Sequence, residues 1–339
     1  MKRTKYLLFS ALSLLLGVTL AFFGSSAAGL GSEELLGKGD RVTVLCLGLD
    51  NAAANTDVLL LLTVDPDRKT ASVLQIPRDT YFAAETAQKK INQLYPYYRS
   101  CGLDTKAALA AVKADVALAL GVPIDYYAAI DLSALSSVLE RLGGLAVNVP
   151  CDIRLARESG DGYIEIPAGA QVLTGEQAVA FLRYRADYAE GDLGRIDAQK
   201  LLFAAVYRKV RGELSLGELA SLVGDTHRDT VTDMPLSRRI SLAYAFYRDR
   251  SAYGVRLATL PGAAIRSQGD AGTWYYVLHR QASCAMLAEL GYAPAFDPEK
   301  RLTDQDNAAM KDLYEKNGVN YTIYTEETLK DLEIKINTK

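Results

Sequence analysis

Three short and almost uninterrupted apolar runs constrain the fold of this 339-residue chain more than any other feature of its sequence. They cover residues 42–49, 58–64 and 71–76, and Val and Leu dominate them. A strand with one face in water alternates apolar and polar residues, whereas a strand that is covered on both faces reads as a continuous apolar run. We therefore expect the three runs to be central strands with a layer of structure on each face.

The segments around and after these runs alternate between strand and helix patterns. Residues 65–69 read Asp-Pro-Asp-Arg-Lys, which is typical of a turn and predicts a hairpin between the second and third runs. The further predicted elements are a helix over 104–120 with Asp104 as N-cap and Gly121 past its end, a strand over 127–130, a helix capped by Ser133, a strand over 145–149, a helix over 174–182 opened by the capping box of Thr174 and Gln177, helices over 194–210 and 237–247, a strand over 254–260 and a helix within 273–291. This alternation predicts an α/β fold, a three-layer sandwich whose mixed central sheet is covered by helices on both faces.

The N-terminus carries three basic residues among its first five and then an uncharged stretch over 6–23. About 17 apolar residues can just span a bilayer, and the positive flank favours leaving the N-terminus in the cytoplasm. We expect a cytoplasmic tail over 1–6, a transmembrane signal anchor over 7–23 and a linker over 24–40. The rest of the chain would then lie outside the cell membrane. A cleaved signal peptide is the alternative, because small residues follow the apolar core.

Charge, cysteine and histidine patterns argue against several classes of function. A net charge of −3 and a pI near 5.6 argue against a basic face that binds nucleic acid. The four cysteines, Cys46, Cys101, Cys151 and Cys284, have no Cys-x-x-Cys spacing, which disfavours a zinc site, although Cys101 and Cys151 could pair in an oxidising compartment. The two histidines, His227 and His279, are isolated, and the chain has no nucleophile-elbow, P-loop or His-Glu-x-x-His motif.

A set of distant arginines could line one anion site. The set consists of Arg78, which precedes Asp79 in an Ile-Pro-Arg-Asp motif after the third run; Arg183 and Arg185, whose side chains point the same way if their segment is extended; and Arg195, which shares a helix face with Gln199. Taken singly, each arginine is more simply a solvated cation beside an acid. Taken together, they indicate a phosphate-like anion. Asp79 could pair with Arg78 or orient another arginine.

Two carboxylates stand at the ends of neighbouring apolar runs. Asp50 follows the first run and Asp57 begins the second. Magnesium takes hard oxygen ligands of this kind, often one or two carboxylates together with substrate phosphate. The alternative is ordinary turn chemistry, in which Asp50 and Asn51 bond the backbone of their own loop. The arginines favour the metal site.

The combination of these motifs resembles the LytR-CpsA-Psr family of cell-wall glycopolymer transferases. The matching stretches are LGLD at 47–50, NTDVLLLLTVDPDRKTASVLQIPRDTYF at 55–82, KIN at 90–92, PIDYYAAIDLSALSSVLERLGGLAVNVP at 123–150, LTGEQAVAFLRYR at 173–185 and GDLGRIDAQ at 191–199. Ile-Pro-Arg-Asp with a downstream Arg-x-Arg and Gly-Asp-x-Gly-Arg is a specific combination. The chain departs from the family at Asn55 and Ala198, where arginine is usual or frequent.

The resemblance implies a membrane-anchored, extracytoplasmic phosphotransferase. Such an enzyme takes a teichoic acid, capsular or other wall polysaccharide from a polyprenyl pyrophosphate carrier and attaches it to peptidoglycan through a phosphodiester. By resemblance, the catalytic residues are Arg78, Asp79, Arg183, Arg185 and Arg195; the pyrophosphate ligands are Arg78, Lys90, Arg183, Arg185, Arg195 and Gln199; and Asp50 and Asp57 hold Mg²⁺ or Mn²⁺. A catalytic domain over 41–212 and a C-terminal extension over 213–339 are expected.

The expected partners are the lipid-linked glycan donor, the peptidoglycan acceptor and the cytoplasmic membrane, with no nucleic acid. Two other activities use the same pocket. In the first, the protein binds lipid or regulates and transfers nothing. In the second, it is a pyrophosphatase, and water replaces the acceptor hydroxyl. Transcriptional control is disfavoured by the predicted topology and by the lack of a basic DNA-binding element.

Overall fold

The computed structural model describes residues 41–49, 56–82, 86, 89–131, 135–157, 160–188, 192–212, 215, 218, 230–266, 272–294, 321–329, 331, 332 and 336. Its elements are β1 (Val42–Leu49), β2 (Thr56–Asp65), β3 (Thr70–Ile76), a 3₁₀ turn η1 (Ile91–Gln93), α2 (Leu94–Ser100), α3 (Thr105–Leu120), β4 (Tyr126–Asp131), α4 (Leu135–Arg141), β5 (Leu145–Val149), β6 (Ile153–Ala156), β7 (Tyr163–Ile166), β8 (Gly169–Leu173), α5 (Gly175–Arg183), α6 (Asp192–Gly212), β9 (Thr230–Thr232), α8 (Leu236–Asp249), β10 (Gly254–Thr259), β11 (Gly262–Arg266), β12 (Trp274–Leu278), α9 (Arg280–Glu289) and β13 (Tyr324–Thr325).

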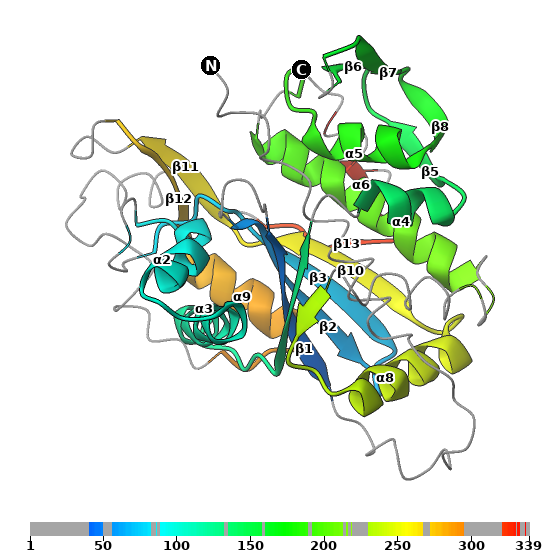
Figure 1. Cartoon of the computed structure of the whole chain (residues 1–339). Helices are drawn as coiled ribbons and strands as arrows, with labels where there is room; N and C mark the ends of the chain where they lie inside the picture. Colours follow the sequence, from blue (N-terminus) through cyan, green and yellow to red (C-terminus); the bar gives the residue numbers. More distant parts are fainter. Residues whose placement is uncertain are drawn as a thin grey trace.

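The centre of the fold is a seven-stranded mixed sheet in the order β13-β10-β3-β2-β1-β4-β9 (Figure 1). The pairs β1–β4 and β3–β10 are parallel, and the other neighbours are antiparallel. The predicted hairpin is present, since β2 and β3 pair in register from Asp65 opposite Thr70. The predicted mixed α/β fold is therefore confirmed.

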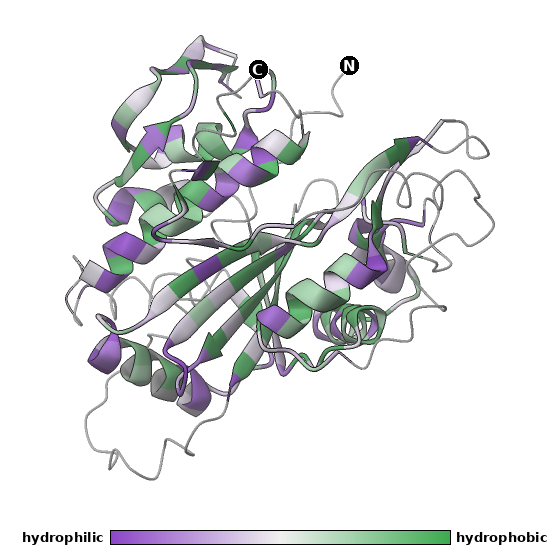
Figure 2. Ribbon diagram, turned by 180° about the vertical axis from the view of Figure 1, so that it is seen from behind, coloured by the Kyte–Doolittle hydropathy of each residue, from purple (hydrophilic) through white to green (hydrophobic). Residues whose placement is uncertain are grey.

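The central strands bury both of their faces. On β1, Leu45 and Leu47 enter one apolar core with α2, α3 and α9, whereas Val44 and Cys46 enter a second core with α5, α6 and α8. Figure 1 shows α3 and α9 on one side of the sheet and α6 and α8 on the other, and Figure 2 shows how apolar the strands between them are. Burial on both faces accounts for the uninterrupted apolar runs.

The sheet continues past residue 212, where we predicted the end of the catalytic domain. Strand β10 lies parallel to β3, with Ala258 opposite Leu74, and β13 pairs with the outer side of β10. At the other edge, β9 pairs with β4. Three strands of the central sheet thus come from the segment that we predicted as a C-terminal extension.

Among the described residues, three small antiparallel pairs lie outside the central sheet. Pairs β5–β8 and β6–β7 form an excursion between α4 and α5, so the strand predicted over 145–149 is present but belongs to a separate pair. The third pair is the β11–β12 hairpin. The sequence prediction had only a helix in the region of β12; the run Trp-Tyr-Tyr-Val-Leu instead has the aromatic and β-branched composition of a strand, and the helix α9 begins after it.

The helix ends follow the predicted cap chemistry. Asp104 accepts a 2.8 Å hydrogen bond from the amide of Ala107, and Gly121 ends α3 in the left-handed region at φ +61°. At α5 both bonds of the capping box are present: the Gln177 amide donates to Thr174 at 3.3 Å, and the Thr174 amide donates to Gln177 Oε1 at 3.1 Å. Ser133, the third predicted cap, lies outside the described residues.

Two further predictions concern the cysteines and the anchor. Cys46 is buried in a core, and no disulfide joins Cys101 and Cys151 in the described part of the structure. Within the ranges given above, no helix has the length and apolar content that a membrane span requires. The predicted anchor over 7–23 lies outside those ranges.

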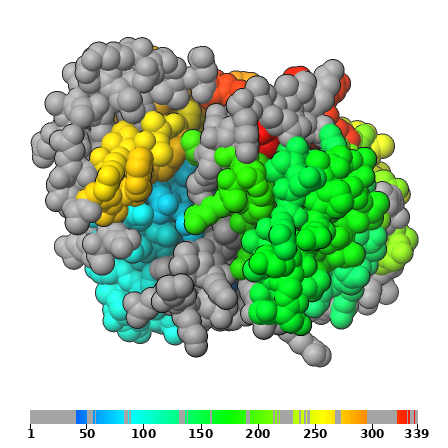
Figure 3. Space-filling model, turned by 90° about the horizontal axis from the view of Figure 1, so that it is seen from above, coloured from blue at the N-terminus to red at the C-terminus, as the bar shows by residue number. Residues whose placement is uncertain are grey.

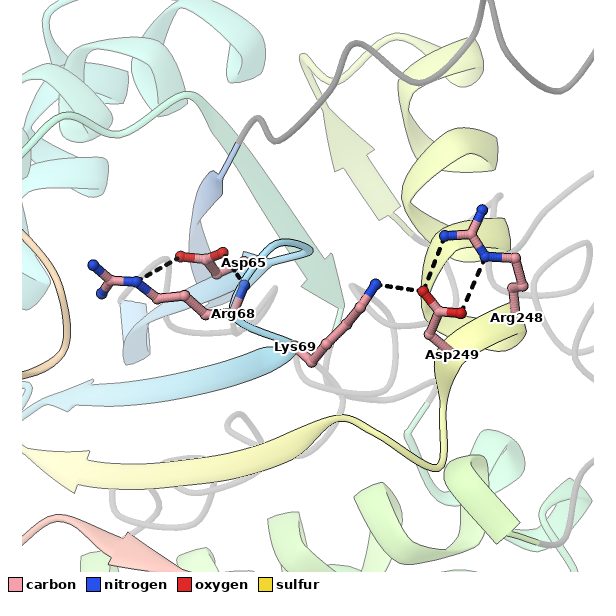
Figure 4. Close-up of polar contacts among 5 residues, drawn as sticks. All are labelled: Asp65, Arg68, Lys69, Arg248 and Asp249. Atoms are coloured by element: carbon pink, nitrogen blue, oxygen red, sulfur yellow. Dashed lines mark hydrogen bonds and ion pairs between the residues drawn. The ribbon is translucent and has the colours of Figure 1, made fainter.

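A charged cluster ties the β2–β3 turn to the end of α8 (Figure 4). Lys69 donates a hydrogen bond to Asp249, and Arg248 donates two to the same carboxylate at 2.9 and 3.1 Å. The hydrogen bonds from Arg248 and then Lys69 hold the pKa of Asp249 below its ordinary value. Lys69 has a φ of +49°, which costs energy for a residue with a Cβ, and the contact with Asp249 helps to offset that cost.

We expect Asp249→Asn to lower the Tm near neutral pH, because it removes the charged partner of Lys69 and Arg248. The decrease should be only about 1–3 °C, because the cluster is partly exposed and exposed ion pairs are weak. A carboxylate whose pKa is depressed by folding stabilises the protein above its unfolded pKa of about 3.9, and this contribution is lost as the pH falls through the folded value. Thermal melts should therefore show the two proteins converging in acid. Asp67→Asn, an exposed change in the same turn, is the control, and a gap that does not narrow in acid would contradict the assignment.

Candidate active site

Gln199 joins the three segments that carry the predicted arginines. The Gln75 side-chain amide donates to Gln199 Oε1 at 3.1 Å across 124 residues of sequence, and Gln199 Nε2 donates to the carbonyl of Leu182 at 3.4 Å. Gln75 lies on β3 shortly before Arg78, and Leu182 directly precedes Arg183. The end of β3, the end of α5 and the first turns of α6 therefore meet.

Arg183 and Arg185 lie at the end of α5 and just beyond it. The helix ends at Arg183, one residue later than predicted, and Tyr184 takes an extended backbone with φ −68° and ψ 139°. Tyr184 is buried, its ring packs edge-on against Tyr188 at 5.7 Å, and its hydroxyl bonds Asp187. Arg183 is half-buried and Arg185 is exposed. Arg183 belongs to the helix, so the extended segment that would align the two arginine side chains begins only after it.

Arg195 is the most deeply buried of the predicted arginines, with 3% of its surface exposed. It lies in the first turn of α6, where the free amides of a helix carry partial positive charge. A buried guanidinium and a helix N-terminus favour the same occupant, an anion. On another side of α6, the buried Lys200 forms an ion pair with Asp197 and lies 5.7 Å from the Tyr324 ring centre, so its charge is balanced within the fold.

Asp79 lies between two cations just after β3. Its carboxylate is 2.8 Å from Lys90 Nζ and 3.9 Å from Arg78 Nε. The side chains of Lys90 and Arg78 are only 13% and 14% exposed, against 35% for Asp79. Of the two roles considered for Asp79, pairing with Arg78 is seen, and the shorter contact with Lys90 is an addition. The cluster keeps a net positive charge.

The loop that carries this cluster is hydrogen-bonded to β12. The backbone amide of Tyr81 donates to the carbonyl of Tyr276, and the backbone amide of Tyr276 donates to the carbonyl of Asp79, both at 2.9 Å. The Tyr275 ring packs edge-on against Tyr81 at 5.3 Å, with Lys90 Nζ 5.8 Å from its centre. In Figure 3 the yellow surface of the β10–β12 region and the green surface of the α5–α6 region flank blue and cyan surface from the first hundred residues. The segment after 212 thus helps to position the site.

The predicted metal ligands lie where β1 and β2 part. Gly48 pairs with Val58 and Leu49 pairs with Thr56, so Asp57 is the extra residue of a β-bulge. Bulges occur next to active sites because they redirect a side chain. Asp50, which follows Leu49, is outside the described residues, and so is the side chain of Asp57. The metal site therefore stays a prediction, for which the bulge is favourable backbone geometry.

The positions where the chain departs from the family pattern differ in what the structure describes. Ala198 is 1% exposed and packs in the core beside α5. Asn55 lies outside the described residues. Sequence reasoning also missed Gln75, which joins the arginine segments through Gln199. The available signal was a single amide in an otherwise apolar strand end, Val-Leu-Gln-Ile.

We expect Asp79→Asn to strengthen the binding of inorganic pyrophosphate by about threefold to tenfold, because the change removes a negative charge that competes with the anion for Lys90 and Arg78. Ligands that bind only the folded state raise the Tm, so pyrophosphate should shift the melt of this variant more than that of the wild type. Asp152→Asn, a change on a distant exposed loop, is the control. A smaller shift in Asp79→Asn would mean that the carboxylate mainly holds the cations in place.

Comparison with known proteins agrees with the geometry. The model of the LytR_cpsA_psr family matches residues 27–291. The polyisoprenyl-teichoic acid–peptidoglycan teichoic acid transferase TagU of Bacillus cereus is 28% identical over 258 residues, which cover 74% of this chain and 79% of that protein. TagV of Bacillus subtilis, which has the same description, is 27% identical over 210 residues. These residues cover 59% of this chain and 51% of that protein.

Solved structures share the fold. The crystal structure of B. subtilis TagV has a TM-score of 0.60 and 24% identity, and the match covers 76% of this chain and all (100%) of that chain. A structure of TagT bound to LI-WTA has a TM-score of 0.57 and 24% identity, with 78% of this chain and 93% of that chain covered. At such identities these likenesses support the fold alone.

Proposed function

Because this chain belongs to the LytR-CpsA-Psr family, we propose that it is a transferase that moves a glycopolymer from a polyprenyl pyrophosphate carrier to peptidoglycan through a phosphodiester. The relatives from two Bacillus species are teichoic acid transferases by description, which favours teichoic acid as the class of polymer. The acceptor would be peptidoglycan, as in those descriptions.

The observation that carries the proposal is the meeting of three cationic segments at Gln199. Phosphoryl transfer depends on neutralising charge and aligning the reactants more than on a covalent nucleophile. Arg183, Arg195 and Arg78 come from segments that share this one junction, so their guanidinium groups can bind one diphosphate from several sides. Fixed donors of this kind also stabilise the charge that develops in the transition state.

The proposed reaction is a displacement at phosphorus. A hydroxyl of the peptidoglycan sugar attacks the phosphorus that bears the glycopolymer, a new P–O bond forms, and the bond to polyprenyl phosphate breaks. The proton of the hydroxyl passes to the leaving polyprenyl phosphate or to water. The arginines compensate the negative charge that collects on the leaving polyprenyl phosphate. Asp79 already contacts Lys90 and Arg78, which favours a role in orienting those cations over that of the proton acceptor.

We also propose that Asp50 and Asp57 hold Mg²⁺ or Mn²⁺. The β-bulge at Asp57, next to the end of β1, suits two oxygen ligands at neighbouring strand ends. When bound, the ion would neutralise phosphate charge. A proposed anchor over 7–23 would place the described part of the chain outside the cytoplasmic membrane, where the lipid-linked donor and the wall acceptor meet; the basic residues before the apolar stretch support this orientation.

We expect Arg183→Ala to reduce transfer by at least about 100-fold, as for the loss of one donor to a transition-state charge. The full chain in detergent would receive a polyprenyl pyrophosphate-linked saccharide, a peptidoglycan oligomer and magnesium, and mass spectrometry would follow the products. Arg154→Ala is the matched control, since Arg154 lies on β6 and pairs with the exposed Glu165 at 3.3 Å.

The products separate the transferase from its alternatives. A phosphodiester-linked adduct that is lost in Arg183→Ala supports the proposal. Release of sugar phosphate without an adduct would indicate a pyrophosphatase, and bound but intact donor would indicate a lipid-binding protein. Normal turnover by Arg183→Ala would contradict its place in the site.

We expect Asp57→Asn to raise the magnesium concentration needed for half-maximal transfer by about tenfold or more, because the neutral amide is a weaker ligand than a carboxylate. A magnesium titration of activity, with Asp67→Asn as a control for carboxylate loss nearby in the sequence, measures this. An unchanged titration curve would remove Asp57 from the metal site.

A further inference from the structure

Gln75 is a buried amide in a strand that is otherwise apolar at this end. It is 5% exposed, between Leu74 at 0% and Ile76 at 3%. Burying an amide is costly unless its donors and acceptors are satisfied. Where the hydrogen bonds of Gln75 go is therefore informative.

Those bonds form a relay across four elements. Thr259 Oγ1 on β10 donates to Gln75 Oε1 at 3.3 Å, and Gln75 Nε2 donates to Gln199 Oε1 at 3.1 Å. Gln199 Nε2 then donates to the Leu182 carbonyl at 3.4 Å. Gln75 and Thr259 are also partners in the parallel β3–β10 register, so the sheet itself holds the start of the relay.

The relay can run in only one direction. A backbone carbonyl can only accept, so the Leu182 end requires the nitrogen of Gln199. Gln199 Oε1 then needs a donor, which only the nitrogen end of Gln75 supplies in the relay. The hydroxyl of Thr259 can donate and completes the relay. Turning Gln199 over would place like groups face to face at both of its ends, and turning Gln75 over would do so at its Gln199 end.

The direction of the relay decides which end of the Gln199 amide an anion would meet. A side-chain amide has two N–H donors on one end and an acceptor oxygen on the other. Because the oxygen of Gln199 is bound to Gln75, the end next to Leu182 and Arg183 carries the donors, and one N–H remains beyond the bond to the carbonyl. Phosphate oxygens can only accept from such a group, so an amide turned the other way would repel them.

We propose that Gln75 is a positioning residue that, with Thr259, fixes the amide of Gln199 so that it offers a donor to the pyrophosphate group of the lipid-linked substrate. Gln75 acts through Gln199 and has no contact with substrate in this role. The inference deepens the proposed function and rests on it.

The test measures the affinity of the full chain in detergent for a short polyprenyl pyrophosphate. Isothermal titration gives the Kd, and the fluorescence of Trp274, the single tryptophan, gives a second readout. We expect Gln75→Leu to weaken binding by about tenfold, the worth of one charged hydrogen bond. Gln75→Glu should weaken it at least as much, because a carboxylate cannot donate to Gln199. Thr259→Val should weaken binding by about threefold, and Thr259→Ser should restore it.

A double-mutant cycle separates positioning from general damage. If Gln75 acts through Gln199, adding Gln75→Leu to Gln199→Leu causes no further loss of affinity. Ser72→Ala is the matched control, because Ser72 is a buried polar residue on the same strand whose side chain points to the opposite face. It should change the Tm without changing the Kd.

Two results would overturn the inference alone: wild-type affinity in folded Gln75→Leu, or losses that add fully in the double variant. If Gln75→Leu fails to fold, the comparison of Thr259→Val with Thr259→Ser decides, and equal affinities would overturn the inference. Failure of the wild type itself to bind the pyrophosphate lipid would overturn the proposed function and the inference together. The wild-type measurement therefore distinguishes the two failures.

Discussion

The rest of the structure depends on the burial of the central sheet on both faces. Strands β1, β2 and β3 have no face left for charged groups, since Leu45 and Leu47 fill one core and Val44 and Cys46 the other. Within the described residues, the charged groups of the predicted site therefore lie where the strands end. Arg78 and Asp79 follow β3, and the bulge at Asp57 lies at one end of the β1–β2 pair. Because the buried strands exclude charged side chains, the predicted site lies at this edge of the sheet.

The helices contribute to this edge through their ends. Segment 183–185 leaves α5 and Arg195 enters α6, so backbone groups that a helix cannot satisfy internally lie close to the arginines. Gln199 uses one such group, the Leu182 carbonyl, as a fixed point. The helix fixes this carbonyl, so the Gln199 amide has one hydrogen-bond partner whose position does not depend on a side-chain rotamer.

Local chemistry was predictable from the sequence, and non-local pairing was not. The caps at Asp104 and Thr174 depend on residues three positions away, and the β2–β3 turn on a five-residue motif, so the pattern alone was sufficient. The motifs that resemble the family also predicted which charged residues belong together. The links that join them could not be read, because Gln75 and Gln199 are 124 residues apart and Gln75 and Thr259 are 184 apart. The role of β12 was missed for the same reason.

The pairing of the Arg78–Asp79 loop with β12 has a consequence for the order of synthesis. Asp79 leaves the ribosome almost two hundred residues before Tyr276, whose backbone amide donates to its carbonyl. Strand β3 is likewise synthesised long before its partner strand β10. Contacts of such long range form late and slowly. During translation, the arginine loop exists for most of that time without the strand that holds it, so a nascent chain carries the chemical groups of the site before the site has formed.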